Sequence, residues 1–152
     1  MYARILVPVD GSEASTQGLK EAIKLARDLN ASMRLVHVID EWVMVSSDAA
    51  TAHVGKVIDL LRAHGESLLK ESEVDVLRAG VDVDAALVEA IGGPAGEHIV
   101  QKAIECRADL IVCGTHGRRG LRRLVMGSDA EYVVRHAPVP VLLVRAQESV
   151  SR

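Results

Sequence analysis

The stretch that decides the fold reads Leu110-Ile111-Val112-Cys113-Gly114-Thr115-His116-Gly117-Arg118-Arg119-Gly120-Leu121-Arg122-Arg123-Leu124-Val125-Met126-Gly127-Ser128. Its apolar start is typical of a buried strand, and its end opens a segment with helical periodicity. Glycine has no Cβ, so backbone N–H groups in the loop between them can approach a bound group and form an anion-binding nest. The following helix adds unpaired N–H groups and the positive end of its dipole. The stretch therefore predicts a strand, a phosphate-binding loop and a helix, in that order.

Short apolar runs of the same kind recur along the chain and alternate with longer segments of helical period. This alternation is typical of βαβ units that stack into a parallel sheet with helices on its faces. Most of the runs are rich in Val, Ile and Leu, as expected of strands that are buried on both faces. Five strands are predicted, at residues 4–8, 33–39, 83–89, 109–114 and 139–145.

Four helices are predicted between these strands from apolar residues that recur every three or four positions. The first follows Ser12, a candidate N-cap. The second is long and ends near Gly80, whose freedom to adopt a left-handed conformation suits a helix C-terminus. The third is defined by the apolar residues Ile99, Val100, Ala103 and Ile104. The fourth is defined by Ala130, Val133, Val134 and Ala137, and it is stopped by Pro138 and Pro140.

Composition limits the class of protein. The chain has 152 residues, which fits one domain, and it is 49% hydrophobic and 26% charged. These proportions exclude an intrinsically disordered chain. The formal net charge is −3, and there are one Trp, two Tyr and no Phe. The basic surface and the aromatic platforms of nucleic-acid binders are therefore missing, and we expect no nucleic-acid partner.

Targeting segments and disulfides are not expected either. The apolar stretch near the N-terminus, residues 5–9, is too short for a secretory signal and far below the ~18 residues of a membrane span. Cys106 and Cys113 lack the spacing of redox or zinc motifs, so both are predicted to be free thiols, with Cys113 in an apolar run. We expect a cytoplasmic protein without a membrane span.

The ends of the predicted strands hold the candidate binding residues, because ligands of open α/β sheets lie outside the carboxyl ends of the strands. After the first strand, Asp10 and Ser12 either form an Asx-turn and a helix cap, or place a carboxylate toward a ribose or a metal that bridges phosphates. Ser128 either caps its own helix, because Ser128-Asp129-Ala130-Glu131 matches a capping box, or points its hydroxyl to a phosphate.

The loop between residues 114 and 128 also carries four arginines, at positions 118, 119, 122 and 123. They either bind phosphate or form a solvated basic loop. His116 has no Asp or Cys at metal-ligand spacing, and we do not predict it to be catalytic. The patterns GxxxxGK[ST] and GxGxxG are absent, and no pair of nucleophile and base is evident. The loop therefore predicts anion binding without indicating a reaction.

Motifs in separate parts of the chain resemble the universal stress protein family, in its ATP-binding branch. Gly114 and Gly117 bracket two residues, and nine residues separate Gly117 from Gly127-Ser128, so the family pattern G-x2-G-x9-G-[S/T] is filled. The opening Ile5-Leu6-Val7-Pro8-Val9-Asp10-Gly11-Ser12, the segment His37-Val38-Ile39-Asp40 and the closing Pro138-Val139-Pro140-Val141-Leu142-Leu143-Val144 also look like that family. The resemblance covers nearly the whole chain.

This resemblance implies a single-domain α/β fold of three layers, Rossmann-like, with a five-stranded parallel sheet in the order 3-2-1-4-5 and helices on both faces. By similarity, ATP would lie across the carboxyl ends of strands one, two and four. Pro8, Val9 and Val38 would line the adenine pocket, and Asp10 would face the ribose or bind the metal. The ribose and phosphates would be held by Gly114, Gly117, Arg118, Gly127 and Ser128.

The resemblance and the missing nucleophile favour a regulatory module of the stress response that binds ATP with Mg²⁺ or Mn²⁺ and is read by protein partners. Enzymatic activity would amount at most to weak hydrolysis or autophosphorylation. The alternatives are a slow ATPase or autophosphorylating phosphotransferase, and a dimeric scaffold without nucleotide. The universal stress protein domain would span residues 1–147, followed by a tail over 148–152. An apolar sheet edge invites another chain, so we also expect a homodimer through strand 139–145.

Overall fold

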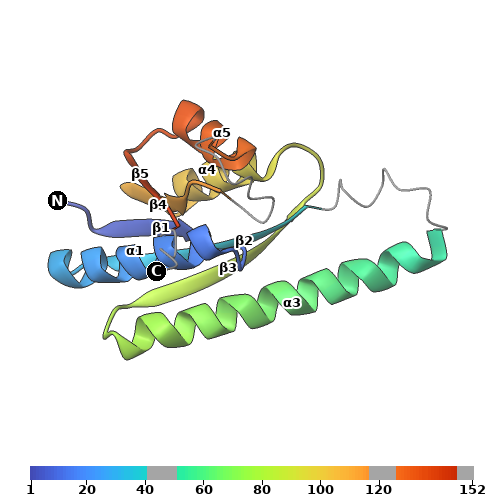
Figure 1. The fold of residues 1–152 in the computed structure, drawn as a ribbon, viewed down its shortest axis with the longest axis horizontal. Coiled ribbons are helices and arrows are strands. Elements are labelled where there is room, and N and C mark those ends of the chain that lie inside the picture. Colours follow the sequence, from blue (N-terminus) through green and yellow to red (C-terminus); the bar gives the residue numbers. More distant parts are fainter. Residues whose placement is uncertain (41–50, 117–125, 147–152) are drawn as a thin grey trace, which may run out of the picture.

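A parallel sheet of five strands forms the centre of the computed structural model, which describes residues 1–40, 51–116 and 126–146 (Figure 1). The strands lie in the order β3-β2-β1-β4-β5, and all neighbours are parallel. This confirms the α/β fold and the strand order expected from the sequence. The strands are β1 (Arg4–Pro8), β2 (Ser32–Asp40), β3 (Val83–Ala90), β4 (Leu110–Gly114) and β5 (Val141–Val144).

Helices cover both faces of the sheet and complete three layers (Figure 1). Successive strand residues point to opposite faces, so Ile5 and Val7 enter one core cluster while Leu6 enters the other. Both faces of the central strands are buried, which explains their continuous apolar runs. On one face lie α1 (Glu13–Leu29) and α3 (Thr51–Arg78), and on the other lie α4 (Ala95–Glu105) and α5 (Ser128–His136).

The last strand is shorter than predicted, and this is a correction of the sequence analysis. β5 begins at Val141 rather than at residue 139 and ends at Val144 rather than at residue 145. Pro140 has no N–H to give to a strand ladder. Its carbonyl still accepts a hydrogen bond from the Ile111 N–H at 3.0 Å, so pairing with β4 starts beside this residue. β5 lies at one edge of the sheet and β3 at the other.

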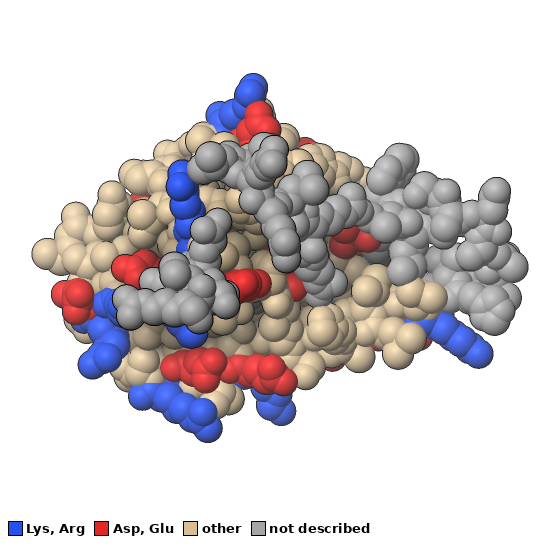
Figure 2. All heavy atoms as spheres, viewed as in Figure 1, with Lys and Arg blue, Asp and Glu red and all other residues tan. Residues whose placement is uncertain are grey.

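Charged side chains of both signs are interspersed over the face of the molecule that Figure 2 shows. Several pair along single helices, as Lys24 does with Glu21 at 3.1 Å and Arg135 with Glu131 at 2.8 Å. Such exposed pairs contribute ~0–1 kcal/mol each, so the buried clusters supply most of the stability. No helix within the described residues is both long enough and apolar enough to cross a membrane.

Candidate functional site

A cavity of about 480 Å³ lies at the carboxyl edge of the sheet, and we call it the carboxyl-edge cavity. It opens where β1, β2 and β4 end, as expected for a binding site in a doubly wound α/β fold. Gly117 and Arg118 lie outside the described residues. The other predicted site residues all line this cavity: Pro8, Val9, Asp10, Val38, Gly114, Gly127 and Ser128.

The loop after β1 is held by side chains that the sequence analysis assigned to two alternative roles. An Asp10 carboxylate oxygen accepts from the Ser12 N–H at 2.8 Å, which is an Asx-turn, and the Ser12 hydroxyl accepts from the Ser15 N–H at 3.2 Å as the N-cap of α1. Buried Ser15, which the sequence analysis did not single out, accepts from the Asp10 N–H at 3.1 Å. Both local roles are confirmed, and they hold Asp10 at the cavity wall.

The backbone of β2 beyond the end of β1 faces the cavity. The last paired residues of the two strands are Pro8 and Val36, and the next residue along, Val9, donates its N–H to the Val36 carbonyl at 2.8 Å. Val38 lies two residues further, so its N–H and C=O point toward the same side, where β1 has already ended. An N–H and a carbonyl presented together match the hydrogen-bonding edge of a planar heterocycle.

Three helix N-termini meet at the carboxyl-edge cavity, because lining residues come from the starts of α1, α4 and α5. The N-caps of α4 and α5 are Pro94 and Gly127, and neither makes a side-chain cap hydrogen bond. Helix N-termini carry unpaired N–H groups and partial positive charge. Ser12 caps α1 and Asp129 accepts from the Gly96 N–H of α4, so of the three termini that of α5 is the one best suited to the anionic group of a ligand.

Ser128 is the first residue of α5 and not its cap, because the N-cap position belongs to Gly127. The capping-box interpretation of Ser128 is thus wrong, and the serine lies exposed at the cavity wall. Gly127 itself has φ −60° and ψ 154°, an extended conformation open to any residue. Its value for a ligand would lie in the missing side chain and not in backbone freedom.

Helix packing outside the cavity also requires a glycine at position 114. A Cβ at this position would lie 2.6 Å from the backbone carbon of Ala14 in α1. The close packing of α1 against β4 therefore requires a residue without a side chain here. The sequence analysis attributed this glycine to the ligand alone, because a contact across a hundred residues leaves no local pattern.

His37 and Gly65 are a second pair that the sequence analysis missed. His37 is 5% exposed, and its ring Nδ1 lies 2.7 Å from the Val9 carbonyl, to which it donates as the protonated nitrogen. A Cβ at Gly65, in the middle of α3, would lie 2.5 Å from His37 Cδ2. The mid-helix glycine was the available signal, since glycine weakens a helix interior unless packing requires it.

A divalent cation would depend on the ligand for most of its coordination. Within the described parts of the chain, no group of three or more His, Cys, Asp or Glu side chains could hold a metal ion. Mg²⁺ is usually bound through one or two carboxylates together with substrate phosphates and water. The Asp10 carboxylate at the cavity wall fits that mode when phosphates complete the shell.

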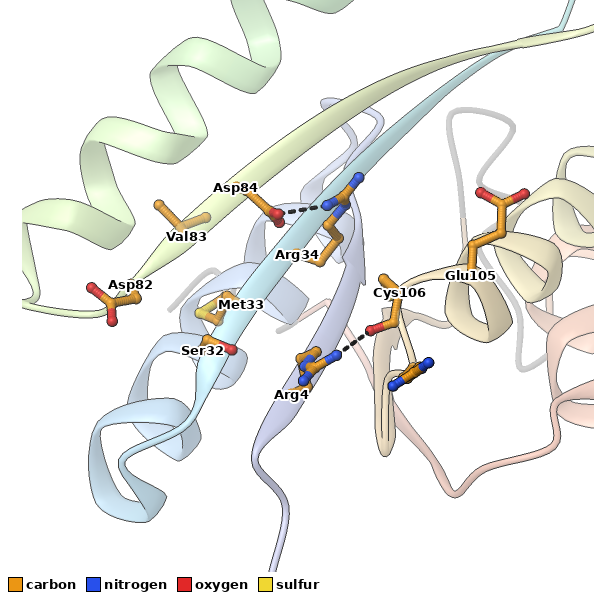
Figure 3. Close-up of a pocket in the computed structure, with 10 residues that line it drawn as sticks. Arg4, Ser32, Met33, Arg34, Asp82, Val83, Asp84, Glu105 and Cys106 are labelled. Atoms are coloured by element: carbon orange, nitrogen blue, oxygen red, sulfur yellow. Dashed lines mark hydrogen bonds and ion pairs between the residues drawn. The ribbon is translucent and has the colours of Figure 1, made fainter.

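A larger cavity of about 620 Å³ lies at the opposite, amino edge of the sheet, and we call it the amino-edge cavity (Figure 3). Two polar contacts join residues of its lining, and Arg34 Nε is buried with no hydrogen-bond partner among the described residues. Arg34 pairs with Asp84 at 2.5 Å, and Arg4 donates to the Cys106 carbonyl at 2.8 Å. Glu105 pairs with Lys102 on α4 at 2.6 Å, which lowers the pKa of its carboxyl. None of the described residues that were predicted to bind a ligand lies there.

The two cysteines are free thiols, as predicted. Cys113 is buried in β4, and desolvation raises the pKa of its thiol from 9.0 to about 11. Cys106 is half-buried at the end of α4 and lines the amino-edge cavity. Neither belongs to the carboxyl-edge cavity, so thiol chemistry is not part of the candidate site.

Comparison with known proteins identifies the family. A model of the universal stress protein family matches residues 1–145. The chain belongs to the universal stress protein family. It is 35% identical over 145 residues to universal stress protein MJ0531 of Methanocaldococcus jannaschii, a match that covers 95% of this chain and 83% of that one. The solved structure of hypothetical protein MJ0577 is 28% identical and superposes with a TM-score of 0.84 over 98% of this chain and 99% of that one.

Two more distant solved structures show the same fold and carry a nucleotide. One is a universal stress protein in complex with cAMP, 23% identical, with a TM-score of 0.70 over 96% of this chain and 98% of that one. The other is the universal stress protein from Archaeoglobus fulgidus in complex with dAMP, 22% identical, with a TM-score of 0.69 over 94% and 98%. Members of this fold thus include proteins with bound adenine nucleotides.

Proposed function

We propose that this universal stress protein binds an adenine nucleotide in the carboxyl-edge cavity and acts as a regulatory module of the stress response. One observation carries the proposal: residues from the ends of three strands and the starts of three helices line one cavity. It has an apolar wall for a base and helix N-termini for phosphate. The cAMP and dAMP complexes of relatives with the same fold support the choice of an adenine ligand.

The proposed arrangement assigns a role to each part of the cavity. Pro8, Val9 and Val38 would line the base, with the backbone of Val38 bonded to its edge. Gly114, Gly127 and Ser128 would face the ribose and phosphates, together with Gly117 and Arg118 from outside the described residues. In this proposal the physiological ligand is ATP, and Asp10 holds its Mg²⁺ or Mn²⁺ ion.

Nucleotide extraction tests this proposal. The purified chain is denatured, and any released small molecule is identified by mass, with a parallel extraction from the Gly127→Val variant as the control. We expect an adenine nucleotide from the parent chain and none from the variant. Parent protein that is devoid of nucleotide and that does not take up AMP or ATP in calorimetry would contradict the proposal and favour a nucleotide-free scaffold.

We also propose that the protein forms a homodimer through β5. This strand pairs on one side with β4 and lies at the sheet edge, where unpaired N–H and C=O groups can join a second copy. Leu142 on this strand is an exposed apolar side chain. Leu143→Pro removes a ladder donor in the strand. Light scattering should then give about half the parent mass with an unchanged helical spectrum, and a folded variant that stays dimeric would place the interface elsewhere.

A further inference from the structure

Asp129 is an acidic residue in the phosphate-facing part of the carboxyl-edge cavity. It follows Ser128 in the first turn of α5 and lines the cavity. Its Oδ1 accepts a hydrogen bond from the Gly96 N–H of α4 at 3.0 Å. Because the α4 N-cap is Pro94 and makes no side-chain cap bond, Asp129 caps α4 from the neighbouring helix. The hydrogen bond holds its carboxylate between the two helix N-termini.

The charged side chains that line the cavity determine how strongly the Asp129 carboxylate repels an anionic ligand. Among the described residues that line the cavity there are three carboxylates, those of Asp10, Asp40 and Asp129, and no Lys or Arg. Asp10 follows β1 and Asp40 is the last residue of β2, whereas Asp129 lies on the α5 side, beside Gly127 and Ser128. A negative charge there repels phosphate groups, and the repulsion grows with each phosphate that is added to the ligand, unless a cation offsets the charge.

We propose that Asp129 selects the nucleotide by its net charge. It lowers the affinity of the site for a phosphate chain that has no divalent cation. The site therefore binds an adenine nucleotide with one phosphate, or metal-bound ATP, more tightly than metal-free ATP. This inference rests on the proposed function and deepens it. Asp129 acts here as a specificity-determining residue, and its bond to Gly96 keeps the charge in place.

The variant Asp129→Asn separates the charge of this residue from its hydrogen bond. Asparagine has nearly the same shape, and its side-chain carbonyl can still accept from the Gly96 N–H. The matched control is Glu131→Gln, which removes one negative charge from the same first turn of α5. Glu131 pairs with Arg135 at 2.8 Å and does not line the cavity.

Calorimetric titrations with AMP, with ATP in EDTA, and with ATP in excess Mg²⁺ provide the test. For Asp129→Asn, we expect the affinity for metal-free ATP to rise about three- to tenfold relative to that for AMP. The affinity for Mg²⁺-bound ATP should change less than about twofold, and the gain should shrink as salt is added. Glu131→Gln should leave all three affinities near those of the parent chain.

The outcomes distinguish this inference from the proposed function. Equal changes for all three ligands, a gain that salt does not reduce, or the same gain in Glu131→Gln would overturn the charge-selection role while leaving nucleotide binding intact. A parent chain that binds none of the three ligands would overturn the proposed function, and the inference with it.

Discussion

The two ends of the sheet carry cavities of comparable size and opposite chemistry. α4 takes part in both: its start at Pro94 and Ala95 lines the carboxyl-edge cavity, and its end at Glu105 and Cys106 lines the amino-edge cavity. The start of α4 offers N–H groups and partial positive charge, whereas its end offers carbonyls and partial negative charge. At the amino edge, Arg4 already binds the Cys106 carbonyl. The polarity of the helix ends, and not cavity volume, is therefore the reason for placing the proposed anionic ligand at the carboxyl edge.

The largest expected effect comes from placing a side chain at the carboxyl edge. Gly127→Val should weaken adenine nucleotide binding at least about 100-fold, or ~2.7 kcal/mol, because the side chain would enter the proposed phosphate position. The extended backbone at Gly127 accepts valine without strain, so the fold should persist. Calorimetry gives the affinity, and circular dichroism checks the fold.

Gly55→Val is the matched control for this change. Gly55 lies on α3, where a Cβ added to it would have no neighbouring atom within 4 Å, and it does not line either cavity. We expect parent-like affinity. A Gly127→Val protein that is folded and binds as tightly as the Gly55→Val control would remove the phosphate assignment from the α5 N-terminus.

The two thiols offer a chemical comparison of the buried sheet and the amino edge. With a pKa of about 11, the Cys113 thiol is only about 0.1% ionised at pH 8, and thiolate is the reactive form. We expect an alkylating reagent to modify Cys106 first and Cys113 at least about 100-fold more slowly. Since ionisation increases with pH below 11, the Cys113 rate should rise about tenfold per pH unit.

Mass spectrometry of peptides from the reacted protein measures both rates, and Cys106→Ser isolates the slower thiol. Similar rates for the two cysteines at pH 8 would show that β4 opens to solvent far more readily than its complete burial around Ile111 and Val112 indicates.

The proposed metal role of Asp10 should give a smaller effect. Asp10→Asn keeps an oxygen that can accept from the Ser12 N–H but removes the charge. Affinity for Mg²⁺-bound ATP should fall about tenfold, while affinity for ATP in EDTA should stay level or rise, because a repulsive charge is lost. Calorimetry with each ligand form makes the comparison.

Asp28→Asn, an exposed carboxylate change on α1 away from both cavities, controls for net charge. If Asp10→Asn weakens both forms of ATP equally, Asp10 acts through the sugar or the turn and does not bind the metal.

The smallest effect is expected at the amino edge. Arg34→Met breaks the pair with Asp84, whose side chain is 61% exposed, so the free energy of unfolding should fall by less than ~1 kcal/mol. Nucleotide affinity should not change. Urea denaturation and calorimetry measure the two quantities. A loss of nucleotide affinity with the fold intact would mean that the ends of the sheet are coupled or that the amino edge binds the ligand.

Much of the fold could be predicted because its signals are local. The apolar runs predicted all five strands, and Asp10 and Ser12 predicted the turn and the cap that precede α1. The ends of β5 were harder to predict from the sequence, because a proline limits a strand but does not determine the residue at which strand pairing begins.

The candidate site was predictable at the strand ends and less so where distant segments meet. A pattern of four residues cannot show that Gly127 takes the N-cap position in place of Ser128. The approach of Gly114 to Ala14, the fit of Gly65 to His37 and the bond from Gly96 to Asp129 all join residues far apart in the sequence. Such contacts depend on how helices pack on the sheet, which no single segment encodes.

The most direct test is a nuclear magnetic resonance titration of the isotope-labelled chain with AMP. Amide signals of Val9, Val38 and Ser128 at the carboxyl edge should shift with saturating dependence on ligand, while those of Ser32, Asp84 and Arg107 at the amino edge should stay in place. Shifts confined to the amino edge, or none at millimolar AMP and ATP, would contradict adenine nucleotide binding at the carboxyl-edge cavity.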